Sequence, residues 1–530
     1  MGTQKANIAT RETLNVNLFN SPTQQTRRDN MTTNSQLAYK KLLKKTKELI
    51  VLQTTEGVMH WDMETKMPPR AVEQRSLQLA LLSRISHQLS TDPEIGNLLK
   101  LVTSKPDYDA LSQIEKRNVY LIKRNYDEQT ALPEELVAEI AKQQTIAVNT
   151  WKRAKNQKNY SILKPELQKL IDLTKKQADI FMKVKQTATS YDAMIDAYEP
   201  RMTAAQITPI FTNLQNGLKK LLEKIQGSHK QSDPSLLHQT VPVDAQQRIA
   251  TELAQTLGYD VTSPNAAGRI DETEHPFTEG YYDDVRITTH YYPDDFASSI
   301  FSVLHETGHA IYDQNLNPEW KYQPVGSHCS MGVHESQSRF MENIVGRSKE
   351  FWTGQLPKIK KIAPQLQNLK LDPFIHAVNN VASSKIRIES DEVTYNLHII
   401  IRFQLEQDLF QDKVNVDELP EAWNQKYKQL LGLTIENDSE GVMQDTHWSS
   451  GYFGYFPSYT LGNIYDGQLL TKIELDIPDW RQQLSVGNLQ NITIWLKNHI
   501  HNQSNLFDPA ELITKVTGKA LDAKPYLKYL

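Results

Sequence analysis

Apolar residues recur along most of this chain with the spacing of an amphipathic helix. Leu42, Leu49 and Leu52 mark one such stripe near the start, and a longer one runs from Ile210 to Ile225. Residues three, four and seven positions apart share one face of a helix. These stripes therefore predict helices whose apolar faces pack into a core.

Local signals predict how two of these helices begin and end. Asp244 and Gln247 have the spacing of a capping box, and the apolar stripe that follows them stops at Gly258. Ahead of the longer stripe, Pro209 is expected in the first helical turn, with Thr208 as the N-cap.

The pattern changes between residues 261 and 292. Gly268, Pro276 and Gly280 interrupt the segment, and Val285 to Tyr292 is rich in β-branched and aromatic residues, which is typical of a strand. Helical spacing returns after Ile300 and continues to the C-terminus. The expected fold is mainly α, with a small β-sheet inserted directly before a helix.

Residues 1–35 show no periodicity and are rich in Thr, Asn and Gln, which predicts a disordered tail. A second interpretation is that the natural start is Met31 and that the segment before it is an artefact. A third is a transit peptide, which the segment weakly resembles. No repeat or linker divides the remainder. Residues 36–530 are therefore expected to form one domain, with two lobes around a groove because of its size.

Composition excludes several classes of protein. The 530 residues carry a net charge of −4, which gives no indication of a nucleic-acid partner. No apolar run approaches the roughly 18 residues of a membrane helix, and no signal peptide is visible. The single cysteine, Cys329, excludes an intrachain disulfide framework and is typical of a reducing compartment. A cytoplasmic location is expected.

The most informative motif is His305-Glu306-Thr307-Gly308-His309. Imidazoles at positions i and i+4 share a helix face and can bind one divalent cation, and Glu306 beside them can accept a proton from water. Six of the 15 histidines lie between residues 275 and 334. Gly308 is unfavourable within a helix, so either close packing or a close backbone approach is expected there.

A catalytic zinc site takes three protein ligands and a water. Glu335, 26 residues after His309, is the preferred third ligand. His334 and His328 are alternative ligands, and a solvated surface role for Glu335 is the other interpretation. No H-x-x-G-x-x-H extension follows His309, which argues against a metzincin site.

With its neighbouring motifs, this site resembles the carboxypeptidase Taq family of metallocarboxypeptidases. Ser390 departs from the family motif I-R-x-x-A-D, where alanine stands. The similarity is carried by motifs that occur in the family's order: Trp61-Asp62-Met63-Glu64-Thr65, Met67-Pro68-Pro69, Tyr198-Glu199-Pro200, His275-Pro276-Phe277, Asp284-Val285-Arg286-Ile287-Thr288, the metal motif, His334-Glu335-Ser336-Gln337, Ile386-Arg387-Ile388-Glu389-Ser390-Asp391 and Gly441-Val442-Met443-Gln444-Asp445-Thr446-His447-Trp448.

The resemblance implies an almost wholly helical fold with a small sheet beside a deep groove, in a homodimer. It implies one zinc per chain, replaceable by cobalt, bound by His305, His309 and Glu335, with Glu306 as the general base for a zinc-bound water. The implied activity removes residues one at a time from peptides with a free C-terminus. It is broad in specificity and poor on proline.

Recognition of a free α-carboxylate favours an arginine. Arg387 is the first candidate and Arg286 the second. The other interpretation for both is a structural ion pair, with Asp391 or Asp284. Four further residues are candidates to donate a hydrogen bond to the oxyanion or to the leaving group: His275, His447, Tyr455 and Tyr459. The other interpretation is that their rings only pack against neighbouring side chains.

Two other functions stay open on the sequence. One is an endo-acting zinc oligopeptidase with the same metal chemistry and a different groove. The other is a non-catalytic peptide-binding protein with a structural metal, which the presence of Glu306 disfavours. Cys329 follows the metal motif and is expected near the groove, either as a buried bystander or as a redox-sensitive thiol.

Overall fold

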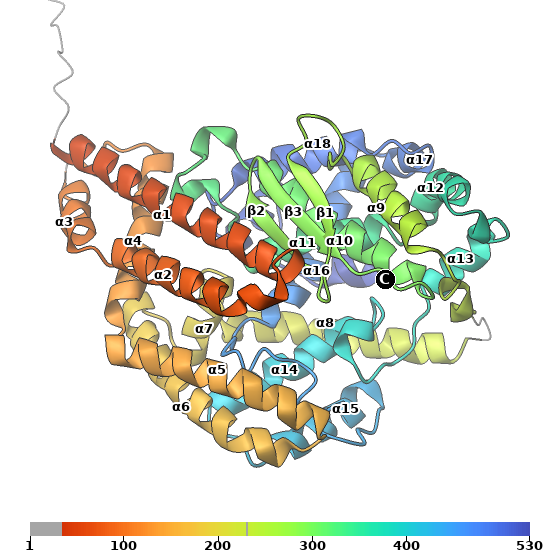
Figure 1. Ribbon diagram of the computed structural model, residues 1–530, viewed down its shortest axis with the longest axis horizontal. Coiled ribbons are helices and arrows are strands. Elements are labelled where there is room, and N and C mark those ends of the chain that lie inside the picture. Colours follow the sequence, from red (N-terminus) through yellow and green to blue (C-terminus); the bar gives the residue numbers. More distant parts are fainter. Residues whose placement is uncertain (1–33, 106, 229–231) are drawn as a thin grey trace, which may run out of the picture.

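The protein is described by a computed structural model for residues 34–105, 107–228 and 232–530. The predicted tail lies outside these residues, except that Asn34 and Ser35 already belong to the first helix. Most of the described chain is helical, which confirms the predicted class (Figure 1). The helices before the sheet are α1 (Asn34–Thr65), α2 (Val72–Ser90), α3 (Pro93–Val102), α4 (Gln113–Ala131), α5 (Glu134–Asn156), α6 (Tyr160–Lys185), α7 (Ser190–Tyr198), α8 (Ala204–Gln226) and α9 (Val243–Leu257).

Helices also make up the chain after the sheet, and a π-helical segment, Phe340–Val345, continues α11. No helix in the described ranges is long and apolar enough to cross a membrane. These helices are α10 (Phe296–Gln314), α11 (Met331–Arg339), α12 (Lys349–Ile362), α13 (Leu371–Val378), α14 (Tyr395–Phe410), α15 (Leu419–Leu431), α16 (Pro457–Asp476), α17 (Trp480–Ser485), α18 (Gln490–His499), α19 (Pro509–Thr517) and α20 (Lys524–Tyr529).

Two predicted helix starts are wrong, for local reasons. α8 begins at Ala204, because Thr203 and Gln206 form a capping box there; Pro209 therefore lies inside the helix. α9 begins at Val243 after Pro242, so Asp244 is not a cap but an acidic residue in the first turn. Its negative charge there interacts favourably with the positive end of the helix dipole.

The end of α9 is as predicted. Gly258 follows the last helical residue with φ of 97°. This left-handed conformation is open to glycine without steric cost, and it ends the helix.

The predicted sheet is present and has three strands in the order β1-β3-β2. β1 (Gly268–Glu272) runs parallel to β3 (Asp284–Thr289), and β2 (Thr278–Tyr281) runs antiparallel to it. The predicted strand stops at Thr289 rather than Tyr292, which forms an isolated bridge instead. Val285 and Ile287 on β3 are fully buried, and β2 and β3 pack on α10.

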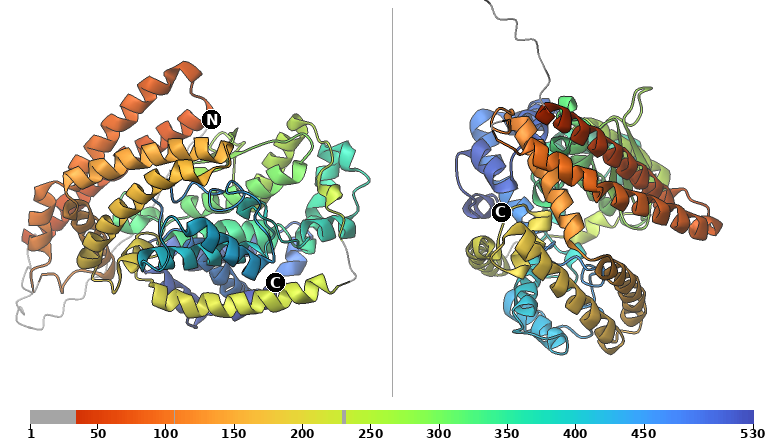
Figure 2. Two further views of the ribbon diagram at one scale, coloured as in Figure 1. Left: turned by 90° about the horizontal axis from the view of Figure 1, so that it is seen from below. Right: turned by 90° about the vertical axis from the view of Figure 1, so that its left-hand side faces the viewer.

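The elements around α10 set the shape of the molecule. The sheet and α9 lie near α10 on one side, while α5, α6 and α15 form the opposite part of the molecule (Figure 1). α1 and α2 form an antiparallel pair at the edge of the molecule in all views (Figures 1 and 2). α1 also packs against β2.

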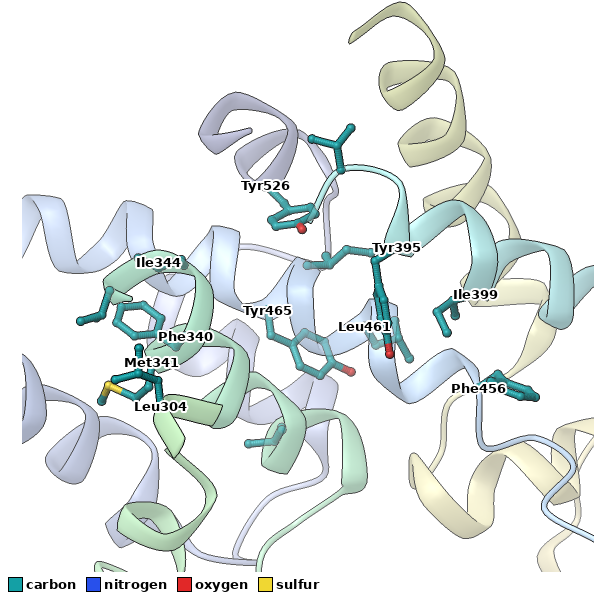
Figure 3. Packing of buried hydrophobic residues seen from close by; sticks show 14 of the residues in the cluster. Leu304, Phe340, Met341, Ile344, Tyr395, Ile399, Phe456, Leu461, Tyr465 and Tyr526 are labelled. Atoms are coloured by element: carbon teal, nitrogen blue, oxygen red, sulfur yellow. The ribbon is translucent and has the colours of Figure 1, made fainter. Parts of the chain in front are cut away.

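Most buried apolar residues belong to one cluster that extends from Ala154 to Tyr526. In Figure 3, Leu304 on α10 packs with Phe340 and Met341, and Tyr465 on α16 lies beside them. A second, smaller cluster joins α1, α3 and α4. The helix that carries the histidine motif, α10, is therefore held by the main core, and part of α1 belongs to the second cluster.

Candidate metal centre

His305 and His309 lie one turn apart on α10. Asp295 caps this helix by accepting a hydrogen bond from the Ser298 N–H. The apolar face of α10, which includes Leu304, packs into the main core. The two imidazole centroids are 4.9 Å apart, so the helical spacing brings both rings to one place.

α11 brings Glu335 to this pair of histidines. The two helices cross at Gly308, where a Cβ atom would lie 2.4 Å from the carbonyl oxygen of Gln337. The expected close approach at this glycine is therefore observed. Glu335 Oε2 lies 3.5 Å from His309 Nε2 and 3.8 Å from His305 Nε2.

These three ligand atoms fit a divalent metal. All lie within 4.8 Å of one another. In a tetrahedral site with bonds near 2.05 Å, ligand atoms are about 3.3 Å apart. The observed spacing needs only a small contraction, and three protein ligands leave a fourth position for water or substrate.

A second layer of charged groups holds the three side chains. Glu342 Oε2 lies 2.8 Å from His305 Nδ1. Arg339 donates to Glu335 Oε1 at 2.8 Å and to Glu342 Oε2 at 3.2 Å. Glu335 Oε1 is therefore occupied by the arginine, while Oε2 faces the two imidazoles and also accepts from the Ser338 hydroxyl at 3.3 Å.

Sequence reasoning did not identify Arg339 or Glu342. They follow Glu335 by four and seven residues, and this spacing predicts side chains on the same helix face. Glu342 lies in the π-helical segment, and such segments are frequent at functional sites.

Burial and neighbouring charges shift the pKa values of this cluster in different directions. Burial works against protonation of His305, but the charge of Glu335 and the hydrogen bond to Glu342 raise its pKa to about 9. Burial and the neighbouring His334 lower the pKa of His309 to about 3. Despite burial, Arg339 and His305 hold the pKa of Glu335 well below its usual range. Glu335 is thus an ionised carboxylate, as a metal ligand must be.

Glu306 lies on the same helix with its side chain fixed by the sheet. The Thr278 hydroxyl on β2 donates to Glu306 Oε2 at 2.6 Å. Glu306 is 6% exposed, and burial raises the pKa of its carboxyl. Thr278 was not foreseen, because its role depends on how the sheet packs on α10.

The alternative ligands His334 and His328 lie together, but apart from the first three ligand atoms. His334 Nε2 is 3.1 Å from Asp313 Oδ2, and its ring stacks on His309 with a centroid distance of 4.2 Å. His328 Nδ1 is 4.0 Å from the other Asp313 oxygen. Asp313 was also missed, although it follows His309 by one helical turn.

The Tyr198-Glu199-Pro200 motif fixes the start of α11. Glu199 accepts hydrogen bonds from the Ser330 hydroxyl, the Gly332 N–H and the Tyr465 hydroxyl. Glu199 is buried, and three donors compensate for the loss of water. This contact fixes the helix that carries Glu335.

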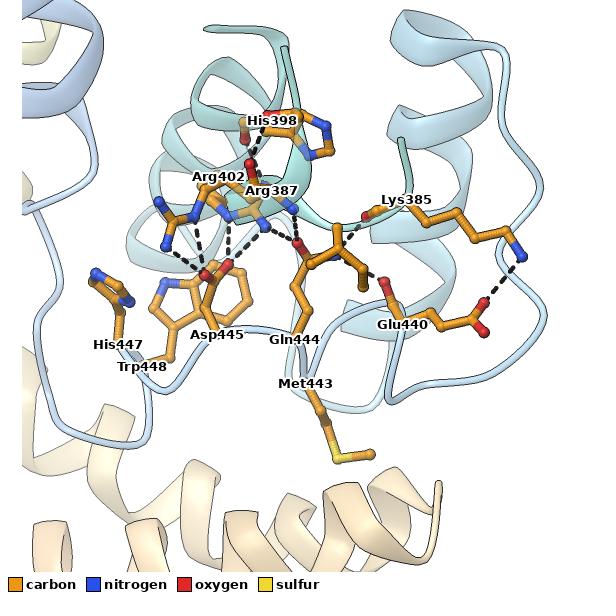
Figure 4. A network of polar contacts seen from close by, with 12 residues as sticks. Lys385, Arg387, His398, Arg402, Glu440, Met443, Gln444, Asp445, His447 and Trp448 are labelled. Carbon is orange, nitrogen blue, oxygen red and sulfur yellow. Dashed lines mark hydrogen bonds and ion pairs between the residues drawn. The ribbon is translucent and has the colours of Figure 1, made fainter. Parts of the chain in front are cut away.

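Arg387 lies in a buried polar network (Figure 4). Its Nε and Nη2 donate to Asp445 Oδ1 at 2.9 and 2.8 Å. Arg402 donates to the other Asp445 oxygen at 2.7 Å. The alternative interpretation, a structural ion pair of Arg387, named the wrong partner: Asp391 accepts from the N–H and hydroxyl of Thr394, and Asp445 pairs with Arg387 instead.

Arg286 lies elsewhere, on β3. It forms two 2.7 Å hydrogen bonds to Asp284, the predicted structural pair. Its guanidinium lies 4.3 Å from the centroid of Trp61, so the tryptophan of the first motif is a stacking platform. His275 is exposed between β1 and β2. Neither Arg286 nor His275 belongs to the cluster of rings beside Arg387, which consists of His447, Tyr455 and Tyr459.

That ring cluster contains the remaining predicted residues. His447 Nε2 is 3.2 Å from the Tyr459 hydroxyl, and the Tyr455 and Tyr459 rings are 5.2 Å apart. Arg387 lies 5.3 Å from the Tyr459 ring centroid. Burial first, and the charge of Glu335 second, raise the pKa of Tyr455. Tyr455 is therefore within electrostatic reach of the metal-ligand set.

A cavity of about 690 Å³ adjoins the centre. Its wall includes Thr278, which holds Glu306, and His334, which precedes Glu335. The remaining lining comes largely from α1 and α4. His305, His309 and Glu335 are not among the described residues that line it, so the groove with the metal at its floor stays a prediction.

Cys329 is 3% exposed, and burial raises the pKa of its thiol to about 12. A buried thiol with so high a pKa is chemically inert, which supports the bystander interpretation. The serine that replaces alanine in the I-R-x-x-A-D motif, Ser390, donates to the Arg387 carbonyl. The substitution is therefore accommodated locally.

Comparison with known proteins identifies the family. The family model for carboxypeptidase Taq (M32) metallopeptidases matches residues 41–530. Thermostable carboxypeptidase 1 of Thermus thermophilus is 41% identical over 501 residues, covering 93% of this chain and 97% of the relative. Carboxypeptidase 1 of Bacillus subtilis is 36% identical over 476 residues, covering 89% and 93%.

Solved structures agree with this match. The structure of Pyrococcus furiosus carboxypeptidase in its Apo-Mg form superposes with a TM-score of 0.89 at 33% sequence identity, covering 93% of this chain and 98% of the other. The fold, the order of the motifs and the ligand geometry thus point to one assignment. The chain belongs to the carboxypeptidase Taq (M32) family and is a metallocarboxypeptidase, a peptide hydrolase.

Proposed function

We propose that this protein removes single residues from peptides with a free C-terminus, using zinc held by His305, His309 and Glu335. The observation that carries the proposal is the convergence of these three ligand atoms within 4.8 Å, beside a buried Glu306. This ligand set holds one zinc, and cobalt fits the same donors. The bound metal supplies Lewis-acid activation of water and of the scissile carbonyl.

Glu306 acts as the general base. Its carboxylate accepts the proton of the attacking water and delivers it to the leaving amine. The hydrogen bond from Thr278 fixes which oxygen stays free for this transfer. Burial raises the pKa of Glu306, which makes its carboxylate a stronger proton acceptor than an exposed one.

Arg387 binds the substrate α-carboxylate. Asp445 and the Tyr395 hydroxyl use three of its five N–H donors and fix the plane of the guanidinium. The remaining donors are free to form a charge-assisted bond. The position of Arg387 beside the Tyr459 ring, which in turn lies next to Tyr455, favours Arg387 over Arg286.

Donors to the developing oxyanion come from the same ring cluster. Burial lowers the pKa of His447 to about 4, so its imidazole is neutral at pH 7 and bonds to Tyr459. Tyr455 and Tyr459 carry hydroxyls whose raised pKa keeps them protonated. A protonated hydroxyl donates a hydrogen bond to a nascent oxyanion. His275 is a weaker candidate, since it is exposed between two strands.

Broad side-chain preference, poor action on proline, a cytoplasmic location and a homodimer complete the proposal. Support for them comes from the family assignment. A single domain over residues 36–530, with two lobes around the groove, is proposed on the extent of the main core. Light scattering of the purified protein measures the oligomer directly, and a monomeric mass at assay concentration rejects the dimer.

The main test uses mass spectrometry of unblocked peptides, incubated with and without a chelator. We expect a ladder that shortens from the C-terminus only when metal is present, and that pauses at proline. Peptides with an amidated C-terminus should stay intact. Internal cleavage of the amidated peptides would instead favour the endo-acting zinc oligopeptidase.

Glu306→Gln tests the base. It should lower kcat by about 10²- to 10⁴-fold, with metal content unchanged by elemental analysis. Glu319→Gln, at an exposed glutamate, is the matched control and should keep full activity. Wild-type activity in the Glu306 variant excludes the proposed base.

A further inference from the structure

A second group of metal-binding side chains lies beside the first. Asp313 is on α10, one turn after His309, and His334 is on α11. His328 lies in the segment that connects these helices. One ligand atom from each residue lies within 4.8 Å of the others, and Asp313 is 3.1 Å from His334 and 4.0 Å from His328.

The surroundings of Asp313 differ from those of an ordinary ion pair. Among the described residues, the ion-pair partners of this carboxylate are imidazoles, and no lysine or arginine is within pairing distance. Despite burial, the charge of His334 and its hydrogen bond keep the pKa of Asp313 low. An ionised carboxylate with imidazole neighbours is a donor set for a transition metal. It has no competing fixed cation.

The His328 side chain is in the neutral form that binds metals. Burial, and then the charge of His334, lower its pKa to about 4. Its imidazole is therefore neutral at pH 7 and offers a free nitrogen lone pair. Its side chain is 39% exposed, while Asp313 and His334 are 13% exposed.

A cation can reach these ligands from the cavity described above. Asp313, His328 and His334 all line it, and Glu279 on β2 lines the same cavity. Burial raises the pKa of Glu279, and the charge of Asp313 contributes to this. Two carboxylates within electrostatic reach of each other favour the entry of a cation into this space.

We propose that Asp313, His328 and His334 form a second binding site for a zinc-class dication, separate from the site of His305, His309 and Glu335. The donor set of two imidazoles and one carboxylate is the same in both sites. Because His334 stacks on His309 with ring planes 16° apart, the two dications lie close and repel each other. The second site therefore fills at higher metal concentration than the first.

The test counts zinc in the full-length protein. The metal-stripped protein is dialysed against a series of buffered zinc concentrations, and zinc per chain is measured by elemental analysis. We expect one plateau at about one zinc per chain and a second at about two, from the two three-ligand sites. A single plateau at one overturns the proposal.

Variants assign the second plateau. His328→Ala should remove it and keep the first, which also shows that the variant is folded. His376→Ala, at an exposed histidine on α13 outside both groups, is the matched control and should keep both plateaus. If the second plateau survives His328→Ala, the extra zinc is bound elsewhere and the proposal is rejected.

Cobalt gives a readout that does not depend on counting. Addition of a second equivalent of Co²⁺ should increase the visible d–d absorption, because a new low-symmetry nitrogen and oxygen site is filled. Asp313→Asn removes the only carboxylate of the site and should abolish this second increase. An unchanged second increase in both variants contradicts the assignment.

Discussion

Two carboxylates of this protein, Glu335 and Asp445, differ in their partners: Arg339 binds one oxygen of Glu335 and leaves the other facing imidazoles, whereas arginines bind both oxygens of Asp445. Glu335 Oε2 faces two imidazoles at 3.5 and 3.8 Å. Asp445 receives Arg387 and Arg402 at 2.8 and 2.6 Å. Both carboxylates have pKa values held far below the usual range by neighbouring cations, despite their burial.

The difference lies in what the partners can do. An imidazole can lose its proton and offer a lone pair, so the space between Glu335 and the histidines can hold a metal. A guanidinium is always charged and offers only donors. The Asp445 cluster is therefore closed to metals, and it serves to hold Arg387 in one orientation. Buried charge alone does not indicate a metal site; the lone pairs of the partners decide.

The largest effect is expected at the arginine cluster. Asp445→Ala leaves two buried guanidinium groups without their counter-ion, which should lower the free energy of unfolding by about 3–5 kcal/mol. Urea denaturation with and without metal measures this loss, which should be the same in both conditions. Glu440→Gln is the control, because it removes a carboxylate from the half-exposed pair with Lys385 in the same region and should have little effect. An Asp445 variant as stable as the wild type would contradict a closed ion-pair cluster.

The next effect concerns the link between metal and stability. With zinc at 100 to 1,000 times its Kd, binding should stabilise the wild type by about 2.7–4.1 kcal/mol. Glu335→Gln removes the anionic ligand and should abolish this gain. Thermal unfolding with zinc and with a chelator measures the difference, and Glu319→Gln should retain the full shift. A persistent zinc shift in the Glu335 variant would argue against Glu335 as a ligand.

A third prediction concerns the free donors of Arg387. Arg387→Lys keeps the positive charge beside Asp445 but loses the planar fork. Losing one charge-assisted bond of about 1.5–3 kcal/mol should raise KM for unblocked peptides by roughly 10- to 100-fold. Arg286→Lys is the matched comparison. A larger increase in KM for this variant would assign the carboxylate-binding role to Arg286.

An effect of similar size is expected where Glu342 supports His305. Glu342→Gln weakens the hydrogen bond to His305 Nδ1 and should reduce zinc affinity by about 10- to 100-fold. Competition with a chromogenic chelator measures the affinity. Glu350→Gln, in the neighbouring helix α12, should leave it unchanged, and an equal loss in both variants would point to a general charge effect.

Local sequence patterns predicted elements better than their boundaries. The stripe from Ile210 to Ile225 identified α8, but Pro209 suggested too late a start, because a stronger capping box lies upstream at Thr203. The segment around Val285 was identified as a strand. Its pairing with two other strands, one parallel and one antiparallel, depends on contacts that no local pattern contains.

The sequence by itself determined that His305 and His309 share a helix face, because a helix repeats every 3.6 residues whatever surrounds it. It also carried the ordered motifs that indicate the family. Only the tertiary structure decided that Gly308 lets α11 approach and bring Glu335 Oε2 to within 3.5 Å of His309. It likewise decided that Arg387 pairs with Asp445, and that Asp313, His328 and His334 gather beside the first site. These contacts join separate elements, so they depend on how helices pack rather than on spacing within one helix.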